Sequence, residues 1–250
     1  MLINPIIDQL KKMKLTGMAE ALNEQLQTPS TNDLNFEQRL GLLVEREKDL
    51  RMTRLLQTRL RQARLHFTQA CVEDINYDAK RQLDKKQIAE LATGNWLRQK
   101  QNLIFTGATG TGKSWIACAI AHKACMLGYR VQYWRVSRLL EELNLAAADG
   151  RYLTLIKSLA KIDLLVLDDW GMVKIKGQQQ QHMLDILDDR YQKRSTLITS
   201  QLPISKWYEQ VIDETFADAI LDRLLGQALV MSISGPSMRT QKEGGNKKKD

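Results

Sequence analysis

The sequence predicts an α/β fold in which helices flank a parallel sheet, preceded by a small all-helical N-terminal domain. From residue 102 onward, apolar runs of strand length alternate with helical stretches, the pattern of parallel strands joined by crossover helices. Before residue 70, apolar residues recur at helical spacing. The chain has 250 residues, of which 43% are hydrophobic, enough for one substantial domain and a small accessory one.

Residues 1–69 are expected to form the helical domain. The apolar positions between Ile6 and Leu22 fit a helix, with Gly17 as the expected interruption, and residues 29–33 have the composition of a loop. A second helical stretch begins at Asn35 and carries basic side chains that are candidate contacts to nucleic-acid phosphates. These candidates are Arg51, Arg54, Arg61 and Arg64. An ordinary solvated helix face would show the same charges, so the pattern alone does not decide.

Residues 70–240 are expected to form the sheet-containing domain. The predicted strands lie at residues 102–105, 132–134, 164–167 and 196–199, with helices between them. Residues 241–250 are rich in lysine and glycine and contain no apolar side chain, so they are expected to be a disordered basic tail.

A glycine-rich octet follows the first predicted strand and opens a helix, which is the order that a phosphate-binding loop requires. It consists of Gly107, Ala108, Thr109, Gly110, Thr111, Gly112, Lys113 and Ser114. Its glycines allow positive φ angles that turn backbone amides toward an anion at the helix N-terminus. Lys113 is placed to reach the β- and γ-phosphates, and the Ser114 hydroxyl is a candidate Mg²⁺ ligand. We therefore expect the chain to bind a nucleoside triphosphate.

Acidic side chains close the third predicted strand. Asp168 is the candidate Mg²⁺ ligand, and Asp169 is placed to orient or deprotonate an attacking water. The fourth predicted strand ends in Ser200 and Gln201, either of which is a candidate bridge between the γ-phosphate and that water. Carboxyl ends of parallel strands share one edge of the sheet, so these groups should face the nucleotide.

Arginines downstream are candidates for a group that acts on a neighbouring subunit. Arg223 lies in an amphipathic helix over residues 216–225, where it either pairs with nearby aspartates or reaches the γ-phosphate bound by a neighbour. Arg190 is a weaker candidate for that role, and Arg239 is a candidate second phosphate sensor.

Net charge and the N-terminal sequence indicate which partners and which cellular location to expect. The formal net charge is +8, which permits contact with nucleic acid without requiring it. No apolar run approaches the ~20 residues of a membrane helix, and the N-terminus lacks the features of a signal peptide. We expect a cytoplasmic protein with no membrane partner.

Several motifs in order carry a family resemblance. They are the octet at 107–114, Leu-Leu-Val-Leu-Asp-Asp-Trp-Gly at 164–171, Thr-Ser-Gln-Leu-Pro at 199–203 and Ala-Ile-Leu-Asp-Arg-Leu at 219–224. Together they resemble the IstB helper ATPases of bacterial insertion sequences, which are grouped with DnaC-like helicase loaders and DnaA-like initiators among the AAA+ ATPases. The similarity extends over nearly the whole chain.

The resemblance implies a division of labour. Subunits carrying ATP and Mg²⁺ would assemble into a ring or spiral on duplex DNA, remodel it and present it to a cognate transposase. Hydrolysis of ATP to ADP and phosphate would then release the helper. Arg223 matches the arginine that acts across the subunit interface, and Asp168 matches the metal ligand. The N-terminal helices match the region for assembly and DNA contact, while Asn76 and Tyr77 match the position of adenine contacts.

Two departures from AAA+ relatives stand out. Asp169 occupies a position where most of them have glutamate, which suggests slow turnover suited to a timing switch. Fewer than thirty residues follow Arg223, too few for a full C-terminal lid.

Two other functions fit the same motifs. A DnaC-like helicase loader would share them and would differ in preferring single-stranded over duplex DNA. A small-molecule kinase would need a substrate pocket and an arginine-rich lid, neither of which is evident in the sequence.

Overall fold

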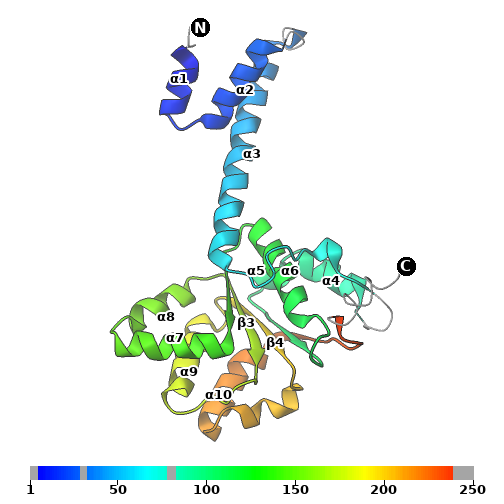
Figure 1. Ribbon diagram of the computed structural model, residues 1–250, viewed down its shortest axis with the longest axis vertical. Coiled ribbons are helices and arrows are strands. Elements are labelled where there is room, and N and C mark those ends of the chain that lie inside the picture. Colours follow the sequence, from blue (N-terminus) through cyan, green and yellow to red (C-terminus); the bar gives the residue numbers. More distant parts are fainter. Residues whose placement is uncertain (1–4, 29–32, 78–82, 239–250) are drawn as a thin grey trace, which may run out of the picture. The chain divides into compact units, whose positions relative to one another are not determined.

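The computed structural model describes residues 5–28, 33–77 and 83–238, and the chain divides into two compact units, Met1–Thr58 and Arg59–Asp250. The first unit is built from helices, and the second contains a sheet with helices on both faces (Figure 1).

In the first unit, α1 (Pro5–Lys12) and α2 (Thr16–Gln27) precede the long helix α3 (Phe36–Ala63), which continues into the second unit. The expected interruption at Gly17 is wrong, because the break falls at residues 13–15 and Gly17 lies in the first turn of α2. A β-carbon at Gly17 would lie 2.7 Å from the Glu47 Cα, so glycine permits the close approach of α2 to α3. The Gly17 N–H also donates to the Glu47 carboxylate at 2.7 Å.

The second unit has a five-stranded sheet in the order β2-β3-β4-β1-β5, with every neighbouring pair parallel. Its strands are β1 (Asn102–Thr106), β2 (Val131–Arg135), β3 (Leu164–Trp170), β4 (Ser195–Ser200) and β5 (Ala228–Ser232). Four of these confirm predicted strands. The sequence analysis missed β5, although residues 228–231 are Ala-Leu-Val-Met. So short an apolar run cannot be told from a helical segment by periodicity alone.

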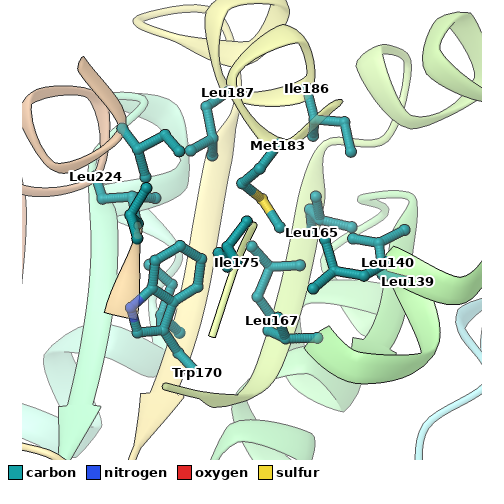
Figure 2. Close-up of a cluster of buried hydrophobic side chains, with 14 of the residues drawn as sticks. Leu139, Leu140, Leu165, Leu167, Trp170, Ile175, Met183, Ile186, Leu187 and Leu224 are labelled. Atoms are coloured by element: carbon teal, nitrogen blue, oxygen red, sulfur yellow. The ribbon is translucent and has the colours of Figure 1, made fainter. Parts of the chain in front are cut away.

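The two faces of the sheet are covered by different helices. On one face, α6 (Lys113–Met126) contacts β1, β2, β3 and β4, and α4 (Lys85–Ala92) packs against it next to the short α5 (Asn95–Arg98). The other face carries a cluster of buried apolar side chains (Figure 2). Its helices are α7 (Val136–Ala148), α8 (Tyr152–Ala160), α9 (Gln178–Arg190) and α10 (Glu214–Leu225).

The alternation of side chains along β3 explains this division. Leu165 and Leu167 enter the cluster with Met183 of α9 and Leu139 of α7, as Figure 2 shows. Successive strand side chains point to opposite faces, so the intervening Val166 faces α6, and both faces of the strand are buried.

Short 3₁₀ turns complete the unit. They are η2 (Val72–Asp74), η4 (Ile204–Lys206) and η5 (Tyr208–Gln210). Of the helices within the described residues, none combines the length and apolar character needed to cross a membrane.

Candidate nucleotide-binding site

The glycine-rich octet joins the carboxyl end of β1 to the first turn of α6, as predicted. Gly107, Gly110 and Gly112 have φ angles of 146°, 79° and 89°. A residue with a side chain is strained in this region, so the loop needs glycine to take this shape. Gly112 is the N-cap of α6, and the loop therefore delivers its amides to the positive end of a helix dipole.

The residues that follow β5 pack directly on this loop. The Ile233 N–H donates to the Thr106 carbonyl at 2.7 Å, and the Met238 N–H donates to the Gly110 carbonyl at 2.8 Å. A β-carbon on Gly107 would lie 2.0 Å from the Ile233 carbonyl oxygen. Glycine is thus required there for close backbone packing as well as for its φ angle.

Polar side chains of the octet hold the loop closed. Lys113 is 6% exposed, and its ammonium donates to the carbonyls of Gly107 and Ala108, each at 2.8 Å. The Thr111 hydroxyl donates to the Ala108 carbonyl at 2.9 Å. The lysine is therefore positioned over the loop by backbone acceptors, with its charge at the concave side where an anion would bind.

A pocket of about 520 Å³ opens beside the loop. Its walls come from the loop and first turn of α6, the segment after α3, the segment around η2, the ends of β2, β3 and β4, and the segment after β5. The lining residues include His66, Phe67, Asp74, Asn76, Thr109, Lys113, Ser114, Trp115, Arg135, Asp169, Gln201 and Met238. The volume suits a ligand of nucleotide size.

Asp168 is the more deeply buried of the two predicted carboxylates, at 1% exposure. One of its oxygens accepts a hydrogen bond from the Tyr133 hydroxyl at 2.5 Å, and the other accepts one from the Thr199 hydroxyl. Burial and the adjacent Asp168 charge raise the pKa of Tyr133, which keeps its hydroxyl protonated as a donor.

Asp169 faces the pocket from an irregular point in β3. The pairing of β3 with β4 shifts between Leu167 and Trp170, and Asp169 has a φ of 62°. Its N–H donates to the Thr199 hydroxyl at 3.2 Å, and its carboxylate lies 3.9 Å from the Arg135 guanidinium. Aspartate is among the residues that tolerate this left-handed conformation best.

The structure separates the two candidates at the end of β4. The Ser200 hydroxyl is fully buried, donates to the Trp170 carbonyl at 2.8 Å and accepts from the Leu202 N–H. Gln201 lines the pocket. Of the two, Gln201 is therefore placed to meet a ligand, while Ser200 fixes the turn that presents it.

Arg223 and Arg190 are not among the described residues that line this pocket. Asn102, at the start of β1, donates its side-chain amide to the Arg223 and Leu224 carbonyls at 2.9 and 3.0 Å. This places the Arg223 backbone at the amino end of β1, and the five residues of that strand, about 16 Å long, separate Asn102 from the phosphate loop. The Arg223 guanidinium is paired with Asp188 at 2.6 Å.

Arg190 is a core residue, and the hypothesis that it acts on a neighbouring subunit is wrong. It is 1% exposed, and it donates hydrogen bonds to the carbonyls of Leu159, Ile162 and Ser195. Burial lowers its pKa to about 9. A guanidinium enclosed in this way has no route to a neighbouring subunit.

The remaining predicted residues are placed as follows. Asn76 lines the pocket, and the ring of Tyr77 lies 6.0 Å from the Lys85 amino group. Arg239 and the tail at 241–250 lie outside the described residues. Arg51 is paired with Glu47 at 2.7 Å. Arg54, Arg61 and Arg64 are exposed.

Sequence reasoning missed the pocket residues His66 and Arg135, and also Tyr133, which binds the Asp168 carboxylate. Tyr133 and Arg135 stand two positions apart near the end of β2, so they share one face of the strand beside β3. That spacing was the available signal. His66 had none, because it follows α3 without a motif.

With this geometry established, comparison with known proteins identifies the family. The family model described as "IstB-like ATP binding protein" matches residues 8–245. The chain belongs to this family.

Relatives from bacteria align over almost the whole chain. An insertion-sequence ATP-binding protein of Sinorhizobium fredii is 46% identical over 239 residues, covering 96% of this chain and 97% of its own. The corresponding protein of insertion sequence IS21 in Pseudomonas aeruginosa is 28% identical, covering 94% of this chain and 88% of its own. The predicted resemblance to the IstB proteins is confirmed.

Solved structures with the same fold confirm the predicted AAA+ architecture. DnaA from Aquifex aeolicus, bound to AMPPCP, superposes with a TM-score of 0.59 at 19% identity, covering 75% of this chain and 58% of that one. A DnaC helicase loader superposes with a TM-score of 0.52 at 18% identity, covering 66% of this chain and 97% of that one.

Proposed function

We propose that this IstB-like protein is a DNA-binding ATPase that assembles on duplex target DNA, remodels it and recruits a transposase, with ATP hydrolysis releasing it. The observation that carries the proposal is the convergence at one sheet edge of a closed phosphate loop, Lys113 and two neighbouring carboxylates. That arrangement combines an anion site with acidic groups able to act on a bound metal and a water.

The donor set of the pocket fits a magnesium nucleotide. Ser114 lines the pocket, and Asp168 is buried just before the pocket-lining Asp169. Their hydroxyl and carboxylate oxygens are the hard ligands that would hold Mg²⁺ with the nucleotide. When bound, Mg²⁺ neutralises charge on the β- and γ-phosphate oxygens. The three glycine positions and Lys113 would hold the phosphates, and the pocket wall around Asn76 would receive the base.

Hydrolysis would then depend on side chains facing the γ-phosphate position. Asp169 would orient or deprotonate the attacking water, and Gln201 would hold that water against the phosphate. Arg135, which lies 3.9 Å from Asp169, keeps a positive charge beside this carboxylate. Exclusion of bulk water by the surrounding walls would strengthen each of these interactions.

Arg223 would complete the site of a neighbouring copy of the chain. It is anchored at the amino edge of its own sheet, and its side chain remains 30% exposed beside Asp188. An arginine supplied across an interface stabilises charge that develops in the transition state of phosphoryl transfer. This role makes assembly a condition for rapid hydrolysis.

The net charge supports the proposed DNA contact, and the family supports the proposed partner. The net charge is +8, and the exposed arginines of α3 offer contacts to phosphates along a duplex. Relatives named as ATP-binding proteins of insertion sequences point to a transposase as the partner.

A helicase-loading function is the second candidate, favoured by the shared fold with the DnaC loader. The two functions differ in the nucleic acid that promotes assembly. A loader acts on single strands, whereas a transposition helper acts on a duplex.

Sedimentation of the full chain with ATP or ADP, on duplex or single-stranded DNA at fixed salt, distinguishes these functions. Large ATP-dependent assemblies on duplex DNA are the expected result. Assembly on single strands alone would favour the loader. A protein that remains monomeric under every condition would overturn both the assembly and the role of Arg223.

A further inference from the structure

β2 and β3 place a tyrosine hydroxyl against the candidate metal ligand. The two strands run parallel with Tyr133 opposite Val166 and Arg135 opposite Asp168. Tyr133 reaches past its own pairing partner and donates to one Asp168 oxygen at 2.5 Å. Thr199 of β4 donates to the other oxygen from the opposite side. Both carboxylate oxygens are therefore held by hydroxyl groups from the two flanking strands.

Building on the proposed function, we propose that Tyr133 and Thr199 are positioning residues that orient Asp168 to hold Mg²⁺ with the nucleotide. A carboxylate has about four acceptor positions, so one hydrogen bond to each oxygen leaves lone pairs for a metal or its waters. The two donors fix the rotation of the carboxylate plane, which an unsupported aspartate would lose. Groups that orient a ligand in this way commonly govern metal affinity.

Tyr133 is itself held in place. Its side chain is buried, and the His66 ring stacks over it with a centroid distance of 6.2 Å and an interplanar angle of 15°. His66 also lies 3.4 Å from Arg135, the next residue on the same face of β2. Burial and the contact with His66 therefore limit movement of the Tyr133 ring away from Asp168. A positioning group needs this rigidity to be effective.

An alternative is that Tyr133 only satisfies a buried charge and contributes stability. The chain contains a matched pair that tests this distinction. The Tyr152 hydroxyl of α8 donates to the Asp185 carboxylate of α9 at 2.6 Å, in a partly buried setting where the Tyr133–Asp168 bond is buried. These two helices cover the sheet face opposite α6, away from the phosphate loop. Loss of the Tyr152 hydroxyl should affect stability in the same manner without touching the metal ligand.

The experiment measures the Mg²⁺ concentration that half-saturates the Mg²⁺-dependent gain in affinity of the full chain for N-methylanthraniloyl-ATP, followed by fluorescence. Tyr133→Phe is expected to raise this concentration about tenfold. Thr199→Val should raise it similarly, whereas Thr199→Ser, which keeps the hydroxyl, should leave it near the parental value. Affinity for the nucleotide in EDTA should be unchanged in all variants. Tyr152→Phe should lower stability with a parental Mg²⁺ response.

A parental Mg²⁺ response in Tyr133→Phe would overturn the proposal, as would an equal shift in Tyr152→Phe. If Tyr133→Phe does not fold, Thr199→Val against Thr199→Ser decides the question by the same measurement. If the parent protein shows no Mg²⁺-dependent nucleotide binding, the proposed function fails as well. If the parent responds to Mg²⁺ and both Tyr133→Phe and Thr199→Val keep its half-saturating Mg²⁺ concentration, only the role of the two hydroxyls is overturned.

Discussion

At the carboxyl edge of the sheet, polar groups from the phosphate loop, β3 and β4 converge on a pocket, whereas at the amino edge Arg223 lies beside an exposed acidic partner. The two edges are separated by the length of β1. A nucleotide bound at one edge is out of reach of the arginine at the other edge of the same chain. On the proposed function, the carboxyl edge is a complete binding site and an incomplete catalytic one.

The two arginines near the amino edge also differ from each other. Arg190 gives its hydrogen bonds to backbone carbonyls inside the domain, and Arg223 directs its guanidinium to Asp188 on the surface. Burial converts one into a structural group, whereas exposure leaves the other able to exchange its partner. Sequence position alone could not separate them, because both lie near the ends of amphipathic helices.

The largest effect should come from removing the proposed contact between Arg223 of one subunit and the nucleotide bound at the carboxyl edge of its neighbour. Arg223→Ala is expected to lower hydrolysis in the assembled state by on the order of 10³-fold, because the transition-state charge loses its partner. Nucleotide affinity of the isolated subunit should be unchanged. Steady-state phosphate release and nucleotide titration measure the two quantities.

A mixing experiment tests whether Arg223 acts across subunits. Lys113→Ala should be inactive alone, because it lacks the charge that binds phosphate, yet it retains Arg223. Adding it to the Arg223→Ala variant should restore part of the activity. Mixtures no more active than their components would show that Arg223 does not act in trans.

For Arg190, in contrast to Arg223, the expected effect of substitution is on the free energy of unfolding. Arg190→Met should lower the free energy of unfolding by about 3 kcal/mol, because it leaves buried carbonyls without donors. Urea denaturation measures this value. The control is Arg194→Met, which removes a half-exposed ion pair with Asp163 at 3.5 Å and should cost less than about 1 kcal/mol. Equal losses in the two variants would contradict the structural role of Arg190.

A substitution at Asp169 changes the carboxyl edge and leaves Arg223 at the amino edge intact. Asp169→Glu is expected to accelerate hydrolysis by on the order of tenfold, because the longer side chain brings its carboxylate nearer the water. It should also reduce stability by about 1 kcal/mol, because glutamate is less tolerant of a left-handed backbone. Single-turnover hydrolysis and urea denaturation give the two numbers. An unchanged rate would refute the idea that the short carboxylate slows turnover.

The smallest effect concerns the proposed DNA contacts of α3. Arg54→Gln should reduce the slope of log affinity against log salt by about one unit on duplex DNA. Arg51→Gln should reduce it less, because Arg51 is already paired with Glu47 at 2.7 Å. Fluorescence anisotropy across a salt series measures the slopes, and identical slopes in the parent and Arg54→Gln would remove Arg54 from the DNA surface.

The sequence was sufficient for the parts of the fold that have strong local signals. The octet at 107–114 combines glycine conformation, a lysine and a following helix, so its geometry could be predicted residue by residue. Asp168 followed from an apolar strand that ends in a charge. The fifth strand was missed, because its four-residue apolar run follows a helical stretch closely and has no periodicity that distinguishes it from helix.

Long-range contacts explain the other omissions. Tyr133 reaches Asp168 across 35 residues of sequence, and Ile233 meets Thr106 through backbone atoms alone. Neither contact leaves a motif in the chain. The choice between Ser200 and Gln201 likewise depended on the direction of the turn after β4, which the spacing of residues does not encode.

The packing of residues 233–238 on the phosphate loop has a consequence for how the protein matures during translation. The loop leaves the ribosome on the order of ten seconds before its last backbone partners, at typical rates of synthesis. Until those partners arrive, the carbonyls of Thr106 and Gly110 lack the amides that bond to them in the finished protein. A nascent chain should therefore acquire its affinity for ATP late and abruptly, which would delay assembly on DNA until each subunit is almost fully synthesised.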